Sequence, residues 1–277
     1  MSGWVAAVAL MFSTGAALPR QAATPGRDDA IAQSREAEGI SPGQLLDLRL
    51  RGGGDQRVLY LSPAKPVAVV VMLPGGAGDI GLEGDGGIRH GNNFLVRTRD
   101  LWVQHGYAVL IPDTIDHASL RGDRSSADYA AAVVDLAGFA RSRASAPVFL
   151  LGTSQGAIAA VNGAAHAPQG LISGLILTES VSRIGGSGES VFSAAPQDVR
   201  VPALVVANRD DQCDVAPPPD APRIVAAMRN SPDAHVAFVN GGTAASGRAC
   251  GSLTPHGYYG IEPQVVDLIA GWMEAHR

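Results

Sequence analysis

Apolar residues gather in short runs that are separated by segments with helical spacing. The first long run, residues 67–73, is continuous and rich in valine, which is typical of a strand buried on both faces. Similar runs follow at residues 108–111, 148–151, 171–177, 203–207 and 236–239. Continuous runs of this kind predict a mostly parallel sheet that is covered on both sides.

The segments between these runs place apolar residues on one face of a helix. The clearest is 127–143, where Ala131, Val134 and Leu136 belong to one stripe. Further helices are expected at residues 94–105, 155–166, 221–228 and 261–275. Strand and helix alternate, which predicts an α/β fold with a doubly wound sheet flanked by helices.

Two shorter strand-like runs precede the first long one. Residues 45–50 and 58–61 flank the sequence Arg-Gly-Gly-Gly-Asp, which predicts an antiparallel hairpin with a glycine turn at one edge of the sheet. With no internal repeat, residues 43–277 are expected to form a single domain.

The N-terminal residues are typical of a targeting segment. Residues 4–12 are apolar but too few to span a bilayer, and small residues follow. Residues 1–23 therefore resemble a secretory signal peptide with an alanine-type cleavage site, although they carry no Lys or Arg near Met1. A polar linker is expected at 24–42, and the protein is expected to be exported, periplasmic or secreted. No later run approaches a transmembrane span.

Composition narrows the function classes. Hydrophobic residues make up 46% of the chain, the formal net charge is −5 and no basic run occurs, so nucleic acid and anionic membrane surfaces are not expected partners. The two cysteines, Cys213 and Cys250, suit one disulfide in an exported protein, although two free thiols would give the same sequence. Neither lies in a metal-binding pattern, so no metal is expected.

One motif carries chemistry. Residues 152–156 read Gly-Thr-Ser-Gln-Gly and fit G-x-S-x-G, directly after the strand 148–151 and at the start of a helix of small residues. Flanking glycines let strand and helix pass close, so that the hydroxyl of Ser154 stands clear of the sheet near a helix N-terminus. We identify Ser154 as the candidate nucleophile; the structural alternative is a serine that caps the helix.

From residue 67 onward the chain resembles the α/β-hydrolase superfamily, and more loosely its single-domain esterases and dienelactone-hydrolase-like members. The resemblance implies a triad in the order Ser, acid, His, with the last two on loops after late strands. His256, in the sequence Thr-Pro-His-Gly-Tyr just before the final helix, stands where the family has its base. His90 and His117 lie in loops that are placed to line the pocket.

The acid is expected directly after the strand 203–207. Family members often have Gly-x-x-Asp here; Asn208 would replace the glycine, because asparagine tolerates a positive φ. Counting three residues on gives Asp211, with Asp210 and Asp214 as alternatives. The acid would accept the ring N–H of the histidine and steady the imidazolium.

The segment after the first long strand is a candidate oxyanion hole. The family often has His-Gly-x here, and Pro74 replaces the histidine. The resemblance then implies that the backbone N–H groups of Gly76 and Gln155 hold the oxyanion.

The same glycines allow a rival interpretation. Gly76-x-Gly78-x-x-Gly81 fits a dinucleotide fingerprint, which would indicate an NAD(P)-binding protein. The fingerprint should open a helix, whereas the residues that follow predict a glycine-rich loop. An acidic residue should also end a second strand about twenty residues on, and Asp100 lies in a helical segment instead.

The cysteines lie close to the proposed acid and base along the chain. Cys213 is two residues after Asp211 and Cys250 six before His256, so we hypothesise a disulfide that ties the two loops. In the chain-entropy model such a bridge contributes about 3–4 kcal/mol.

The expected activity is hydrolysis of a carboxylic ester, or a related acyl bond in a small molecule, through an acyl-enzyme and without a cofactor. Only residues 178–199 separate two successive strands, which is too short for a cap domain, so the pocket should be open. An acyltransferase with the same triad and a non-catalytic binding module are alternatives. Ester hydrolysis is preferred by analogy with small open family members.

Overall fold

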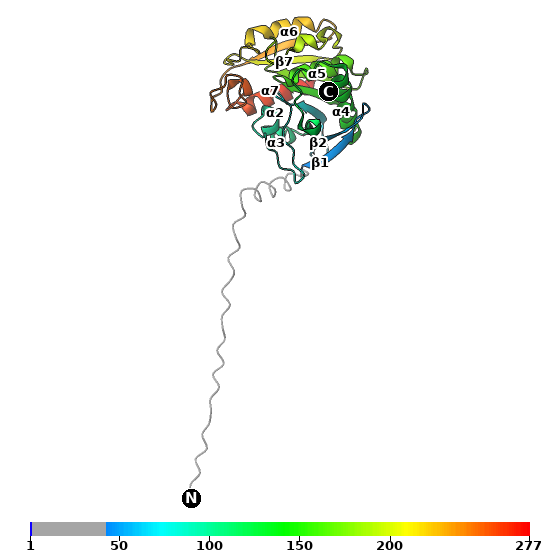
Figure 1. Cartoon of the computed structure of the whole chain (residues 1–277), viewed down its shortest axis with the longest axis vertical. Coiled ribbons are helices and arrows are strands. Elements are labelled where there is room, and N and C mark those ends of the chain that lie inside the picture. The colour runs from blue at the N-terminus through cyan, green and yellow to red at the C-terminus, as the bar shows by residue number, and fades with distance from the viewer. Residues whose placement is uncertain (2–42) are drawn as a thin grey trace.

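The computed structural model of the chain describes Met1 and residues 43–277. In the described part, an eight-stranded sheet carries helices on both faces (Figure 1). Apart from Met1, the predicted signal peptide (1–23) and linker (24–42) lie outside the described residues. None of the described helices is long and apolar enough to cross a membrane.

The sheet is mostly parallel, with the strand order β1-β2-β4-β3-β5-β6-β7-β8. The strands are β1 Gln44–Arg49, β2 Asp55–Leu61, β3 Ala68–Leu73, β4 Tyr107–Pro112, β5 Val148–Thr153, β6 Gly174–Thr178, β7 Ala203–Asn208 and β8 Ala234–Val239. β2 pairs antiparallel with both β1 and β4, and the remaining neighbours are parallel. The predicted fold class, with its N-terminal hairpin, is confirmed.

Alternate side chains of β3 reach opposite faces of the sheet, as the pleat of a strand requires. The helices of residues 43–277 are α2 Phe94–Arg97, α3 Arg99–Gln104, α4 Ala127–Arg143, α5 Gly156–His166, α6 Ala221–Ala227 and α7 Glu262–Ala275. Val69 and Val71 pack in a buried cluster with α4, α5 and α6. Val70 and Met72 pack in a second cluster with α2, α3 and α7. The central strands β3 to β7 are therefore buried on both faces, which explains their continuous apolar sequences.

Two expected elements differ from those observed. The helix expected at 94–105 is broken at Thr98, whose hydroxyl donates to the Phe94 carbonyl (2.7 Å) and ends α2 before α3 begins. The strand expected at 171–177 begins only at Gly174, because Leu171 closes a turn onto the carbonyl of Pro168 (3.0 Å). In both places a local hydrogen bond shortens the element that the spacing of apolar residues predicts.

No cap domain stands between β6 and β7. The connection contains only two short 3-10 helices, Val191–Ser193 (η2) and Pro196–Asp198 (η3). The predicted absence of a cap is confirmed for the described residues, and the carboxyl edge of the sheet is left accessible.

The fold makes a sharp prediction about two helical glycines. A Cβ on Gly156, at the start of α5, would lie 1.9 Å from the carbonyl oxygen of Leu73, whereas a Cβ on Gly138, inside α4, meets nothing within 4 Å. We expect Gly156→Ala to lower the free energy of unfolding by about 1–3 kcal/mol or more. Gly138→Ala should raise it by about 0.5–1 kcal/mol. Urea denaturation measures both, and equal stability of the two variants would contradict the close approach.

Candidate active site

Ser154 occupies the tight turn between β5 and α5. Its φ of 53° is strained for a residue with a side chain. Its N–H donates to the carbonyl of Thr178 on β6 (2.8 Å), which fixes the turn from the neighbouring strand. A Cβ on Gly152 would lie 2.3 Å from the carbonyl oxygen of Gly156. The two glycines therefore permit the turn, and Ser154 lines the adjacent cleft.

His256 reaches Ser154 from the loop after β8. It lies in the short 3-10 helix η5 (Pro255–Gly257), where its N–H donates to the hydroxyl of Thr254 (3.2 Å). The loop turns too tightly for a side chain at Gly257, because a Cβ there would lie 2.0 Å from a carbonyl oxygen of the same loop. The His256 Nε2 lies 3.0 Å from the Ser154 Oγ, within hydrogen-bond distance.

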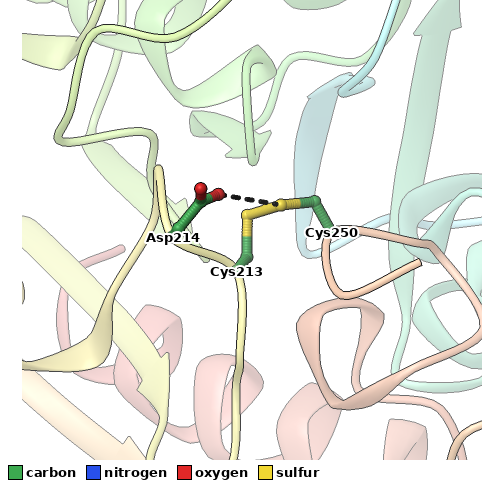
Figure 2. A group of neighbouring side chains, drawn as sticks. All are labelled: Cys213, Asp214 and Cys250. Atoms are coloured by element: carbon green, nitrogen blue, oxygen red, sulfur yellow. Dashed lines mark hydrogen bonds between the residues drawn. A yellow bond between two sulfur atoms is a disulfide. The ribbon is translucent and has the colours of Figure 1, made fainter. Parts of the chain in front are cut away.

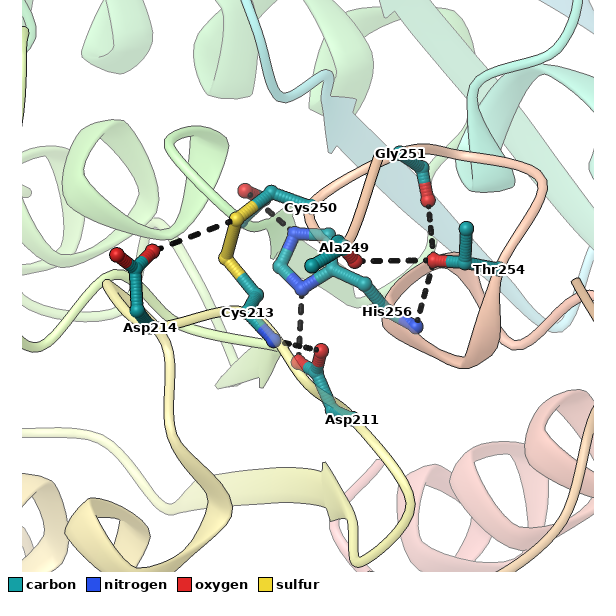
Figure 3. Close-up of a disulfide and its surroundings, with 9 residues drawn as sticks. Asp211, Cys213, Asp214, Ala249, Cys250, Gly251, Thr254 and His256 are labelled. Carbon is teal, nitrogen blue, oxygen red and sulfur yellow. Dashed lines mark hydrogen bonds and ion pairs between the residues drawn. A yellow bond between two sulfur atoms is a disulfide. The ribbon is translucent and has the colours of Figure 1, made fainter. Parts of the chain in front are cut away.

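Asp211 contacts the opposite nitrogen of the imidazole (Figure 3). Its Oδ2 lies 2.7 Å from the His256 Nδ1, and its Oδ1 accepts the N–H of Cys213 (2.8 Å). The side chains of His256 and Asp211 are only 4% and 0% exposed. When Nδ1–H donates to the buried carboxylate, the Nε2 lone pair is free to accept the proton of the serine hydroxyl.

The two alternative acids point elsewhere. Asp210 is exposed, and its Oδ2 accepts the N–H of Gly241 (2.6 Å). Asp214 lies beside the disulfide, with its Oδ1 4.0 Å from the Sγ of Cys250 (Figure 2). Of the three carboxylates weighed from the sequence, Asp211 is the one that faces the histidine.

Asn208 corrects one sequence expectation. It was expected to adopt a positive φ in place of a glycine, but it is not among the residues that do. Its buried amide instead donates to the carbonyls of Gly241 (2.9 Å) and Pro255 (3.0 Å). Asn208 thus ties the end of β7 to the residue before the histidine, a role that needs a side-chain donor and that glycine cannot fill.

Arg124 contacts both segments that carry the predicted oxyanion donors, Gly76 and Gln155. It is 1% exposed, and its guanidinium donates to the carbonyl of Pro74 (3.2 Å) and to the side-chain oxygen of Gln155 (3.3 Å). Burial lowers the pKa of this guanidinium, because a dry environment disfavours the charged form. Sequence analysis missed Arg124, which lies in the loop between β4 and α4 and meets these segments only in the folded chain.

The loop after β3 packs directly against the serine turn. A Cβ on Gly75 would lie 3.0 Å from the Cβ of Ser154. Gly76, the predicted oxyanion donor, has a φ of 62° and lines the same cleft as Ser154.

The glycines of the rival dinucleotide fingerprint open no helix. After Gly81 the chain forms an isolated antiparallel bridge between Leu82 and Ile88. The N–H groups of Ile80 and Leu82 donate to the buried carboxylate of Asp113 (2.9 and 2.6 Å). Because no helix N-terminus follows the glycines, the pyrophosphate site of a dinucleotide fold is not formed here.

A cleft of about 470 Å³ lies over the serine and histidine. Its lining combines polar and apolar groups, including His90 and Arg248 beside the apolar ring of Phe94. His90 was predicted to line the pocket and does so. His117 does not line this cleft; it borders a separate hollow, with its Nδ1 3.1 Å from the Oδ1 of Asp79.

A disulfide joins Cys213 to Cys250 across a sequence separation of 37 residues (Figure 3). Cys213 is buried directly after the Asp211 segment, whereas Cys250 is exposed and lines the cleft. The bridge therefore fastens the loop of Asp211 to the loop of His256, as hypothesised from the sequence.

The bridge leads to a test of stability. We expect the double variant Cys213→Ala, Cys250→Ala to lose about 3–4 kcal/mol of the free energy of unfolding. The wild type treated with reductant is the matched control and should show a similar loss, while the double variant should be insensitive to reductant. Two free thiols in unreduced, unfolded wild-type protein would contradict the disulfide.

No protein-family model matches the chain, and no curated protein matches its sequence. Solved structures do match. A dienelactone hydrolase from Anabaena variabilis is 13% identical, with 85% of this chain and 98% of that chain covered at a TM-score of 0.61. An esterase from Pyrococcus furiosus is 11% identical, with 87% and 94% covered at a TM-score of 0.61.

The ferulic-acid-bound Est1E of Butyrivibrio proteoclasticus is 13% identical, with 83% of this chain and 98% of that chain covered at a TM-score of 0.58. The chain has the α/β-hydrolase fold. The fold explains why three residues far apart in the sequence meet, because the loops after β5, β7 and β8 of an α/β-hydrolase sheet end at one edge. It does not by itself assign an activity.

Proposed function

We propose that this protein is a serine hydrolase that cleaves carboxylic esters through an acyl-enzyme. The observation that carries the proposal is the hydrogen-bonded series from Asp211 through His256 to Ser154, with contacts of 2.7 and 3.0 Å. A buried carboxylate, an imidazole and a hydroxyl in this order form a nucleophile with its base and the group that orients the base.

The proposed reaction has two halves. As the Ser154 hydroxyl attacks the ester carbonyl, its proton passes to the Nε2 of His256, and the imidazolium is stabilised by Asp211. The imidazolium then protonates the leaving alcohol as the carbon–oxygen bond breaks. In the second half a water gives its proton to the same nitrogen, attacks the acyl-enzyme and releases the carboxylic acid and free serine.

The oxyanion is proposed to be held by the backbone N–H groups of Gly76 and Gln155. The contact of Gly75 with the serine turn supports this role, since it brings the loop after β3 next to the reacting hydroxyl. The hydrogen bonds from Arg124 support it further, because they connect the same loop to Gln155. Donors fixed before the reaction stabilise the developing charge without reorganisation.

The substrate is proposed to be a small acyl compound. The cleft is uncapped and has a volume of about 470 Å³, which fits a small molecule. Structures of similar fold whose names describe esterases support an ester as the substrate class.

Export remains part of the proposal. The disulfide between Cys213 and Cys250 supports it, because such bonds persist in oxidising compartments and are rare in the cytosol.

A fluorophosphonate probe tests the proposed nucleophile. We expect the wild type to acquire a covalent adduct on Ser154, and Ser154→Ala to lose both the adduct and the hydrolysis of a p-nitrophenyl ester, with kcat falling by about 10⁶-fold. Ser252→Ala, which removes another hydroxyl from the same cleft, is the matched control and should keep the adduct.

Absence of an adduct on folded wild-type protein would contradict the hydrolase and favour a binding module. Labelling of Ser154→Ala as fast as the wild type would assign the nucleophile to another residue. Peptide mass spectrometry distinguishes these outcomes, because it reports which side chain carries the probe.

A further inference from the structure

A second buried carboxylate lies behind the proposed triad, and the reaction above does not use it. Glu179 follows β6 directly, is 1% exposed and has a positive φ of 43°. Its backbone N–H donates to the carbonyl of Val206 on β7 (3.2 Å), and the preceding carbonyl, that of Thr178, accepts the N–H of Ser154. Glu179 therefore stands at the junction of the strands that carry the nucleophile and the acid.

Only one of the two carboxylate oxygens of Glu179 has a hydrogen-bond partner. Its Oε1 accepts the backbone N–H of Asn208 (2.8 Å), but its Oε2 is buried and has no hydrogen-bond partner. A buried carboxylate oxygen without a donor is costly in the ionised state, whereas the protonated oxygen is itself a donor and carries no charge.

Two ionisable groups lie close to the carboxylate of Glu179. Glu179, Asp211 and His256 are all buried, and they bring one carboxylate oxygen or ring nitrogen each to within 4.8 Å of one another. Among residues 43–277, His256 is the single basic residue that pairs with either carboxylate, through Asp211. A neutral imidazole leaves two adjacent negative charges uncompensated if both acids are ionised.

Tyr258 completes the surroundings of Glu179. It is fully buried, and its hydroxyl donates to the carbonyl of Val206 (3.0 Å), so its single proton is already used. Burial, first of all, and then the charge of Asp211 raise the pKa of Glu179 well above its ordinary range. Asp211 accepts two N–H donors, from Cys213 and His256, whereas Glu179 accepts one, from Asn208.

We propose that Glu179 is a positioning residue that stays protonated at neutral pH and keeps the single negative charge of the buried carboxylate pair on Asp211. The neutral acid removes the repulsion between two buried carboxylates, so that Asp211 accepts the ring N–H of His256 as a charged acceptor. Through Oε1 the same side chain holds Asn208, whose amide in turn holds the carbonyl of Pro255. The functional half of this inference rests on the proposed hydrolase; the protonation state does not.

Infrared spectroscopy tests the protonation state directly. A protonated carboxylic acid has a carbonyl stretch that is resolved from the band of an ionised carboxylate. We expect wild-type protein at neutral pH to show this stretch, Glu179→Gln to lose it, and Glu274→Gln, which changes an exposed glutamate at the C-terminal end of α7, to retain it.

A second variant tests the coupling between the two acids. Asp211→Asn removes the adjacent negative charge, so we expect the pH at which the Glu179 stretch disappears to fall by roughly one unit or more relative to the wild type. An unchanged midpoint would show that Asp211 does not control the proton on Glu179 and would overturn the shared-charge proposal.

Absence of the stretch in wild-type protein would also overturn it, whether or not any variant folds. Persistence of the stretch in folded Glu179→Gln would assign the proton to another group, with the same consequence. Neither measurement depends on turnover, so failure here is distinct from failure of the proposed hydrolase, which the covalent probe reports.

Kinetics test the positioning role. Glu179→Ala should lower kcat about tenfold with a smaller change in KM, because it loosens Asp211 and Asn208 rather than the substrate cleft. Glu179→Gln, a neutral residue of the same shape, should recover most of that loss. A glutamine variant as slow as the alanine variant would contradict a neutral side chain at this position.

Discussion

The architecture of the candidate site depends on one hydrogen bond, between the carboxylate of Asp211 and the Nδ1 of His256. Both side chains are almost completely removed from water, so the bond is strong. Its loss would leave the buried carboxylate of Asp211 with the N–H of Cys213 alone. The bond also decides which face of the imidazole meets Ser154. Without it neither the tautomer nor the orientation that presents an unprotonated Nε2 to the hydroxyl would be fixed.

The surrounding structure holds the two ends of that bond from several directions. The disulfide connects the two loops covalently, and the amide of Asn208 connects the end of β7 to Pro255 by a hydrogen bond. Glu179 accepts the N–H of Asn208 and so holds the end of β7, three residues before Asp211. These contacts come from the end of β6, from the end of β7 with the loop after it, and from the loop after β8. The conformational strain at Ser154 is offset by the packing of the parallel sheet beneath the turn.

Much of this arrangement can be predicted from sequence, because it depends on local pattern. Continuous valine-rich runs predict the parallel strands, and a serine between glycines after such a run predicts the tight turn. The same pattern fails where a local hydrogen bond interrupts it, as at Thr98. Asp211 and His256 are expected from the resemblance to α/β-hydrolases. The fold can bring them to Ser154 because the loops after β5, β7 and β8 lie at one edge of the sheet.

The supporting residues could not be predicted in the same way. Arg124 and Glu179 carry no local motif, and each gains its role from partners brought together by the fold, such as Pro74 for Arg124. Glu179 offers a weak signal, as a charged residue directly after an apolar strand, whereas Arg124 lies in a polar segment and offers none. Asn208 was singled out for its backbone, and the structure shows that its side chain is what matters.

Proton NMR of the imidazole tests the central hydrogen bond most directly. A ring N–H that donates to a buried carboxylate is strongly deshielded and is protected from exchange with water. The account predicts such a resonance in the wild type, its loss in Asp211→Asn and its persistence in Asp210→Asn. Absence of this resonance from folded wild-type protein, or its survival in Asp211→Asn, would contradict the arrangement on which the proposed activity depends.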